Sequence, residues 1–276
     1  MPPFSGPAVV GRSAYSELMS PNPGKAAVLR DLHFARELLT VVNVWDVISA
    51  KVIADLDGTT ALATASHSIA ASYGYQDGEQ IPVDLMIEAV GRIAAATDLP
   101  VSADLEAGYG DPGETTRKAI GAGIVGANLE DQMKPLPEAV AAVEAVVRAG
   151  EAEGVPFVLN ARTDAFLKAG DRDPSDVLAD AIERGKAYLE AGAPVVFFPG
   201  KPDLATVTAL VDALGPQRVT LIGVPGSLPL ATLRDLGVAR VSYGPWSQRV
   251  ALTALADFAT DVIGGGALPE GTRPLN

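Results

Sequence analysis

The chain has 276 residues, 48% of them hydrophobic, with no cysteine and only two histidines. These counts exclude disulfides, cysteine-ligated zinc and a metal site built from several histidines. The net charge of −13 at pH 7 argues against nucleic-acid binding, because nucleic-acid-binding proteins present a basic face to their ligand.

The sequence carries no pattern for secretion or membrane insertion. Its first residues lack a charged segment followed by an apolar one, so no signal peptide is predicted. No apolar run reaches the roughly 18 residues that a membrane span needs, so no span is predicted either. A cytoplasmic location is therefore the expectation.

A helical pattern covers about residues 24–38, ahead of the first predicted strand. Eight short apolar runs then recur along the chain. They are continuous rather than alternating, which is typical of parallel strands covered on both faces. The predicted strands span residues 38–44, 60–65, 99–105, 126–130, 156–162, 194–199, 218–224 and 240–244.

Helical patterns separate the predicted strands. The first of them opens with Asp46, a good N-cap, and Pro82 stands in the first turn of the next. Eight strand–helix units predict a (β/α)8 barrel, with the helix at about 24–38 covering its bottom; a doubly wound open sheet is the alternative. No linker is visible, so residues 1–276 are predicted to form one domain with a loose tail at about 264–276.

Acidic residues gather at the carboxyl ends of the predicted strands, where a barrel places its active site. Asp104 and Glu106 are two residues apart, so in a strand they would share one face about 7 Å apart and repel by about 2 kcal/mol. Glu130, at the end of the next strand, adds a third charge. Such a cluster either raises a carboxyl pKa or binds a cation, and oxygen-only ligands suit Mg²⁺ or Mn²⁺.

Structural roles compete with these functional ones. Arg162, at the end of the fifth strand, could neutralise Glu106 or Glu130 in a structural ion pair. His67 by itself is more often a loop histidine with satisfied hydrogen bonds than an acid or base. Three aspartates are equally well explained as helix N-caps, namely Asp46, Asp111 and Asp131.

Five motifs, in order, resemble the isocitrate lyase/phosphoenolpyruvate mutase superfamily, and the resemblance runs from about residue 41 to 252. It implies a (β/α)8 barrel whose eighth helix is exchanged between subunits of a dimer or tetramer. It also implies a bound Mg²⁺ and a 2-oxo or enol-type acid as substrate. The motifs are NVWDVISAKV, TASHSIAASYGYQDGE, ADLEAGYGD, GANLEDQ and NARTDAF.

The resemblance also implies a metal site. Asp104 matches the direct metal ligand of the family. Three more carboxylates match those that hold the ion largely through its waters, namely Asp77, Glu106 and Glu130.

A substrate site follows from the same motifs. Arg162 resembles the residue that pairs with the substrate carboxylate, and the backbone N–H groups of residues 65–67 resemble a cradle for the same group. Arg162, His67 and Tyr109 are the catalytic candidates, with Tyr73 or a metal-bound water as other proton carriers. The implied substrate-binding residues are Trp45, Asp46, Ala65, Ser66, His67, Asn160 and Arg162.

One part of the family pattern is absent from this chain. The lyases of the family carry a mobile loop with a catalytic cysteine after the fourth strand, and the mutases carry a longer gating loop with an asparagine. Here the corresponding link, MKPLPEAVAAVEAV, leads directly into a helix, and Lys134 is the one charged residue between Asp131 and that helix. The resemblance therefore implies an intact metal and oxo-acid site without the lid that is specific to each reaction.

The expected function is a Mg²⁺-dependent carbon–carbon lyase, of decarboxylase or retro-aldol type, acting on a small 2-oxo or 2-hydroxy di- or tricarboxylate through an enolate. A phosphonopyruvate- or phosphoenolpyruvate-type mutase or hydrolase is the first alternative. A 2-oxo-acid-binding protein without turnover is the second.

The last helical pattern, at residues 245–264, has a broad apolar face. In a closed barrel that face could pack on its own strands. The resemblance instead implies that the helix is exchanged with a neighbouring subunit, so that the protein is a homodimer or homotetramer.

Overall fold

A computed structural model describes residues 21–275 of the chain. The N-terminal segment in which no signal peptide is predicted lies outside the described residues, as does Asn276. Within residues 21–275, no helix is both long and apolar enough to cross a membrane.

The strands are all parallel and form one continuous ring. The first predicted strand is split at Val42 into β1 and β2; β1 pairs with β9 and β2 pairs with β3. The two ends of the sheet thus belong to one stretch of chain, which closes the barrel, so the (β/α)8 prediction is confirmed and the open sheet is wrong. The strands are β1 (Leu39–Val41), β2 (Asn43–Val44), β3 (Leu62–Thr64), β4 (Val101–Asp104), β5 (Gly126–Glu130), β6 (Val158–Arg162), β7 (Val195–Phe198), β8 (Val219–Ile222) and β9 (Arg240–Ser242).

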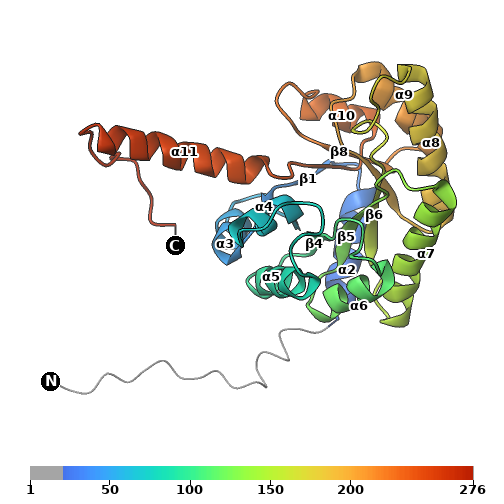
Figure 1. Cartoon of the computed structure of the whole chain (residues 1–276), viewed down its shortest axis with the longest axis horizontal. Helices are drawn as coiled ribbons and strands as arrows, with labels where there is room; N and C mark the ends of the chain where they lie inside the picture. The colour runs from blue at the N-terminus through green and yellow to red at the C-terminus, as the bar shows by residue number, and fades with distance from the viewer. Residues whose placement is uncertain (1–20, 276) are drawn as a thin grey trace.

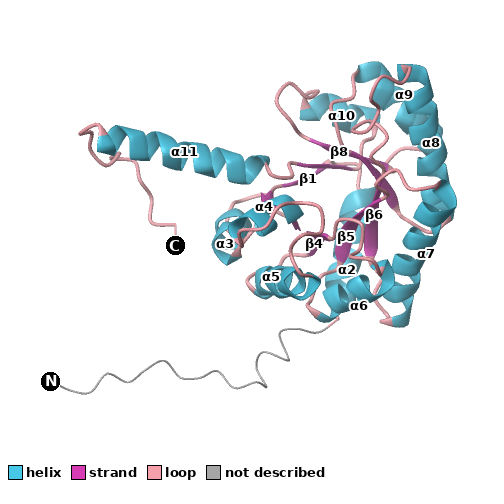
Figure 2. Cartoon of the chain, in the orientation of Figure 1, coloured by secondary structure: helices cyan, strands magenta, loops and turns pink. Residues whose placement is uncertain are grey.

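Apart from α2 and α11, the helices lie between consecutive strands in the chain and are arranged around the ring, as Figure 2 shows. Their buried sides supply the apolar layer between helices and strands. The helices are α2 (Pro23–Phe34), α3 (Val47–Ala54), α4 (Ser66–Ser72), α5 (Val83–Ala95), α6 (Pro112–Gly121), α7 (Leu136–Ala152), α8 (Pro174–Glu190), α9 (Leu204–Leu214), α10 (Leu230–Leu236) and α11 (Trp246–Ile263).

Two helices differ from the sequence-based expectation. Helix α4 lies where a loop was expected; it is too short to be stable alone, but Ile69 and Ala70 are fully buried, so packing holds it. Helix α2 ends at Phe34 rather than near residue 38, because the next residue, Ala35, is extended and leads the chain toward β1.

Helix α2 covers the bottom of the barrel, as predicted. Leu29 is fully buried and packs against Gly126, the first residue of β5. A Cβ at Gly126 would lie 2.8 Å from Leu29 and 2.7 Å from the carbonyl oxygen of Val158, so only glycine fits at this contact. The packing leaves the opposite end of the barrel, at the carboxyl ends of the strands, for a site.

Helix α11 extends away from the barrel, as Figure 1 shows. Its apolar side chains are exposed to 69% at Val250, 58% at Leu255 and 86% at Ile263, and Gln248 is its one buried residue. The alternative in which this helix packs on its own strands is therefore wrong. An apolar face left open in one chain is the geometry that exchange between subunits would require.

Candidate functional site

A cavity of about 330 Å³ opens at the carboxyl ends of the strands, and we call it the central cavity. Because parallel strands all end at the same rim, residues far apart in sequence meet there. Its lining residues are Asn43, Ala65, Ser66, His67, Asp77, Gly78, Asp104, Glu106, Asn128, Glu130, Arg162, Leu167, Phe197, Pro199, Gly200, Ile222, Val224, Ser242, Gly244 and Pro245.

Asp104 and Asp77 share one hydrogen-bond donor on the cavity wall. Asp104 is the last residue of β4, and its Oδ2 accepts from the Ser66 hydroxyl at 2.9 Å and from the Ser66 backbone N–H at 3.2 Å. The same hydroxyl lies 3.3 Å from Oδ1 of Asp77. Ser66 therefore holds the two carboxylates beside each other, although Asp77 comes from an exposed loop.

Glu106 reaches the cavity by a different route from the predicted one. The strand ends at Asp104, and Glu106 has a left-handed backbone with φ 52°, so the expectation that both side chains share a strand face is wrong. Its carboxylate accepts from the backbone N–H of Glu79 and, at 3.0 Å, from the hydroxyl of Tyr109. These bonds hold Glu106, which lines the same cavity.

Two of the lining carboxyl groups have strongly raised pKa values. Burial, with smaller contributions from the charges of Asp104 and Asp77, raises the pKa of Glu106 to about 7. Burial also raises the pKa of Glu130 to about 7, against the opposing effect of the Arg162 charge. Without a cation, this site therefore holds protons near neutral pH.

These shifts predict how the stability of the metal-free protein depends on pH. The carboxyl of Glu106 has a pKa of about 7 in the folded protein and an ordinary value of 4.5. Its protonation therefore stabilises the fold fully below about pH 4.5, and this contribution is lost as pH rises through about 7. We expect the pH dependence of the free energy of unfolding between about pH 5 and about pH 8 to be weaker in Glu106→Gln than in the wild type. Urea unfolding in EDTA measures it, and identical pH profiles for both proteins would contradict the shift.

Glu130 and Arg162 lie opposite each other in the register of β5 and β6. Nη1 of Arg162 is 2.8 Å from Glu130, and Nε is 2.8 Å from Asp164. Of the two structural ion pairs considered for Arg162, the one with Glu130 is present, whereas no pair with Glu106 is found among the described residues. Nη2 has no partner within residues 21–275, which leaves one end of the guanidinium for a ligand.

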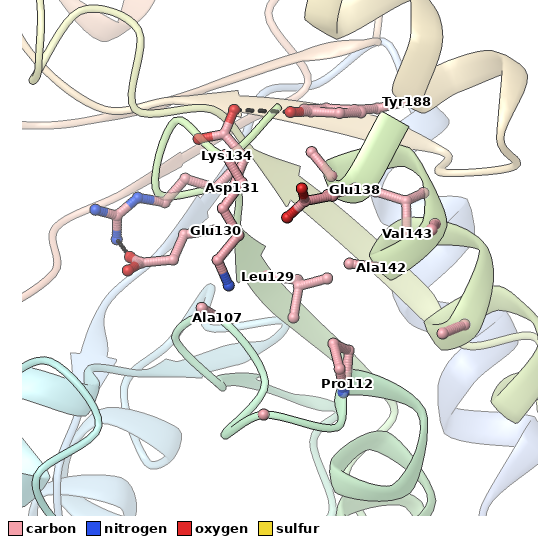
Figure 3. A pocket seen from close by; sticks show the side chains of 15 residues that line it. Ala107, Pro112, Leu129, Glu130, Asp131, Lys134, Glu138, Ala142, Val143 and Tyr188 are labelled. Atoms are coloured by element: carbon pink, nitrogen blue, oxygen red, sulfur yellow. Dashed lines mark hydrogen bonds and ion pairs between the residues drawn. The ribbon is translucent and has the colours of Figure 1, made fainter. Parts of the chain in front are cut away.

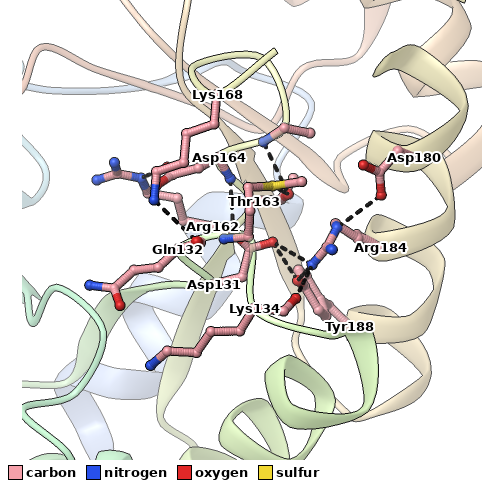
Figure 4. A network of polar contacts seen from close by, with 12 residues as sticks. Asp131, Gln132, Lys134, Arg162, Thr163, Asp164, Lys168, Asp180, Arg184 and Tyr188 are labelled. Carbon is pink, nitrogen blue, oxygen red and sulfur yellow. Dashed lines mark hydrogen bonds and ion pairs between the residues drawn. The ribbon is translucent and has the colours of Figure 1, made fainter. Parts of the chain in front are cut away.

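The side chain of Asp131, just past β5, is buried and accepts four hydrogen bonds (Figure 4). Its Oδ1 accepts from the backbone N–H groups of Met133, at 2.9 Å, and Asp164, at 3.1 Å. Its Oδ2 accepts from the hydroxyl of Tyr188, at 2.7 Å, and from Arg184, at 3.1 Å. The N-cap interpretation of this residue is therefore wrong, since the carboxylate joins the link after β5 to β6 and α8.

We expect Asp131→Asn to lower the free energy of unfolding by about 2–3 kcal/mol, because Arg184 would lose a buried charged partner. The matched control is Asp180→Asn, which removes a more exposed carboxylate from the same guanidinium and should cost less than about 1 kcal/mol. Urea unfolding of both variants tests the difference, and equal losses would rule out a special role for Asp131.

Buried polar side chains lie beneath the central cavity. Asn160 is fully buried; its amide donates to Asn128 at 2.8 Å, and its oxygen accepts from the hydroxyl of Thr220 at 2.6 Å. Asn128 lines the cavity whereas Asn160 does not. In place of the predicted contact with substrate, the Asn160 amide holds the side chain of Asn128 from below. Asn43, which had no predicted role, lines the cavity and accepts from the backbone N–H groups of Tyr243 and Gly244.

Three other predicted site residues lie outside the lining of the central cavity. Asp46 is the N-cap of α3 and forms a capping box with Ser49, so its structural interpretation is confirmed. Trp45 precedes it and does not line the cavity. Tyr109 binds Glu106 through its hydroxyl and so positions that carboxylate. Asp111 is likewise an N-cap, of α6.

The predicted residues at the start of α4 do line the cavity. Ala65 is the N-cap residue of this helix, and Ser66 and His67 form its first turn. The buried Nδ1 atom of the His67 ring has no hydrogen-bond partner within residues 21–275. An imidazole can donate or accept a proton, so His67 is the lining residue that suits proton transfer.

A second cavity, of about 310 Å³, lies beside the first, between the end of β5 and α7 (Figure 3). It shares Glu130 and Arg162 with the central cavity, but Asp77, Asp104 and Glu106 do not line it. Its wall combines alanines of α7 with charged residues, among them Asp131, Lys134 and Glu138.

The donor chemistry of the central cavity fits a hard divalent ion. Among residues 21–275, no three Asp, Glu or His side chains converge closely enough to hold an ion directly. Mg²⁺ keeps several of its waters and commonly takes only one or two carboxylates directly. A divalent ion would therefore be held here by one or two of these carboxylates and by its own waters.

Comparison with known proteins gives matches along most of the chain. The family model of phosphoenolpyruvate phosphomutase matches residues 29–263. An uncharacterized protein of Mycobacterium tuberculosis is 33% identical over 244 residues, covering 87% of this chain and 90% of that protein. A 2-methylisocitrate lyase of Escherichia coli is 30% identical over 229 residues, covering 76% and 75%.

Two solved structures resemble the fold closely. A candidate phosphonomutase from Burkholderia cenocepacia has a TM-score of 0.80 and 42% identity, covering 86% of this chain and 99% of that one. An oxaloacetate acetylhydrolase in complex with its product oxalate has a TM-score of 0.80 and 26% identity, covering 91% of each chain. The chain therefore belongs to the phosphoenolpyruvate phosphomutase family, within the isocitrate lyase/phosphoenolpyruvate mutase superfamily of enzymes.

Proposed function

We propose that the protein is a Mg²⁺-dependent carbon–carbon lyase, of decarboxylase or retro-aldol type, acting on a small 2-oxo or 2-hydroxy di- or tricarboxylate through an enolate. One observation carries this proposal, namely that four carboxylates and a guanidinium meet in the central cavity. Carboxylates are the ligands that Mg²⁺ and Mn²⁺ prefer, and a guanidinium is a specific partner for a substrate carboxylate. The carboxylates are Asp77, Asp104, Glu106 and Glu130, and the guanidinium is that of Arg162.

In this proposal Asp104 binds the ion directly and the other three carboxylates hold its waters. The ion, when bound, supplies Lewis-acid polarisation of the substrate oxygen beside the breaking bond. Arg162 binds the substrate carboxylate through Nη2, while Glu130 and Asp164 fix the plane of the guanidinium. His67, from the first turn of α4, carries the proton that the cleaved product takes up.

Turnover assays with Mg²⁺ on oxaloacetate, a methylisocitrate-type tricarboxylate and phosphonopyruvate test the proposal. A lyase releases a 2-oxo acid from the first or second substrate without releasing phosphate from the third. Binding of these acids without any product would instead support the alternative of a binding protein without turnover.

A phosphonate or phosphoenolpyruvate enzyme is the second candidate, and both the family model and the likeness to the candidate phosphonomutase favour it. Against it, Arg162 is the one cationic side chain among the described lining residues, whereas a transferring phosphoryl group is usually held by several cations. Phosphate release from phosphonopyruvate would support this candidate over the lyase.

We also propose that the protein is a homodimer or homotetramer in which α11 is exchanged. The exposed apolar side of this helix supports exchange, because burial against another subunit would remove it from water. Light scattering should give at least twice the chain mass of 28.4 kDa, and truncation before Pro245 should yield insoluble or unfolded protein. A stable monomer of the whole chain would contradict the exchange.

A further inference from the structure

The side of the central cavity that faces the carboxylates contains no charged group. Strands β7, β8 and β9 and the segments directly after them contribute only uncharged residues to the lining. Phe197, Ile222 and Val224 form its apolar surface, and Leu167 adds to it from the segment after β6. We call Phe197, Ile222 and Val224 the apolar wall.

The apolar wall begins directly beside the proposed carboxylate partner. Phe197 lies opposite Arg162 in the register of β6 and β7, and Ile222 ends the next strand along the ring. On its other side Arg162 is flanked by Glu130. A ligand whose carboxylate meets the guanidinium therefore has the metal-binding carboxylates on one side and the apolar wall on the other.

The charge of the lining also disfavours an additional anionic group. When ionised, the four carboxylates and Arg162 carry a net charge of −3, which a divalent cation would reduce to −1. A ligand carboxylate at Arg162 makes the site more negative again. A carboxylate placed at the apolar wall would then face an apolar surface without a cation, which costs free energy because the buried charge stays unpaired.

The polar groups nearest the apolar wall do not offer a replacement cation. Asn43 is engaged with backbone, since its oxygen accepts from Tyr243 and Gly244 and its amide donates to the carbonyl of Thr64. Lys201 follows the lining residue Gly200 in sequence but does not line the cavity, and its ammonium lies against the loop at residue 226.

We infer that the apolar wall receives an uncharged alkyl substituent of the substrate and selects against a distal carboxylate. This inference rests on the proposed function and narrows its substrate class. Among the proposed substrates it favours a dicarboxylate that carries an alkyl substituent, and it makes tricarboxylates poor ligands.

Isothermal titration calorimetry of the full-length protein with saturating Mg²⁺ tests this with three probes. Pyruvate reports on the shared 2-oxo-carboxylate site, whereas 2-oxopentanoate and 2-oxoglutarate differ only in ending with a methyl group or a carboxylate. We expect 2-oxopentanoate to bind at least about tenfold more tightly than 2-oxoglutarate.

Variants of the apolar wall make the test specific. In Val224→Lys the affinity ratio of 2-oxopentanoate to 2-oxoglutarate should fall at least about tenfold, because the ammonium pairs with the distal carboxylate. Val224→Met is the matched control, because methionine is a long side chain without charge. In this variant the affinity ratio of 2-oxopentanoate to 2-oxoglutarate should stay close to that of the wild type. Loss of preference in both variants alike would overturn the inference, since it would reflect shape rather than charge.

Two further outcomes separate this inference from the proposed function. If pyruvate binds but 2-oxoglutarate binds as tightly as 2-oxopentanoate, the inference is overturned and the proposed function stands. Loss of that 2-oxoglutarate binding in Lys201→Met would then identify Lys201 as the distal partner. If none of the three acids binds in the presence of Mg²⁺, the proposed function fails and the inference fails with it.

Discussion

Asp104→Ala is expected to weaken Mg²⁺ binding by more than about 100-fold while the barrel stays folded. The carboxylate ends β4 at the rim of the central cavity, and within residues 21–275 its hydrogen-bond donors both belong to Ser66. Its removal therefore takes away the proposed direct ligand without opening the apolar core. Calorimetric titration with Mg²⁺ measures the affinity, and circular dichroism measures the fold.

The matched control is Asp173→Ala, which removes an exposed aspartate that caps α8 and does not line the cavity. This variant should lose about 1 kcal/mol of stability through the cap and keep its Mg²⁺ affinity. Unchanged Mg²⁺ affinity in Asp104→Ala would remove the metal site from this part of the barrel.

Arg162→Lys is expected to weaken binding of oxalate, measured with saturating Mg²⁺, by at least about tenfold. The guanidinium contacts Glu130 and Asp164 and still has Nη2 for a ligand. A lysine ammonium is a single point, so it cannot keep both carboxylates and also present a donor to the substrate.

A purely structural role for Arg162 predicts a different result. The melting temperature would then fall while the affinity for oxalate stayed near the wild-type value. Measuring both quantities on one variant separates these roles. Arg148→Lys is the control, because that arginine forms an exposed pair within α7, and neither quantity should change.

The barrel itself could be predicted because its signals are local. Continuous apolar runs indicate buried parallel strands, and caps such as Asp46 and Asp111 satisfy backbone groups within three residues. The order of strands and helices then restricts the topology to few arrangements. The meeting of Asp104, Glu130 and Arg162 in one cavity follows directly from that topology.

The details that tune the site could not be predicted in this way. Glu106 leaves the strand through a left-handed turn, and its partners, Glu79 and Tyr109, come from two different loops. Asp131 looks like a cap in sequence, but its partners include Tyr188, 57 positions away. Hydrogen bonds between distant segments depend on the distances of the folded chain, and no local pattern encodes them.

The parallel barrel, the family resemblance and the identity of the acidic side chains follow from the amino-acid sequence alone, because each depends on residue type and spacing along the chain. The folded structure is needed to tell which carboxyl groups have raised pKa values, because burial and neighbouring charges depend on how the chain folds. It also decided that the wall opposite them is apolar and that α11 leaves its own barrel. Both depend on where distant segments come to lie when the chain folds.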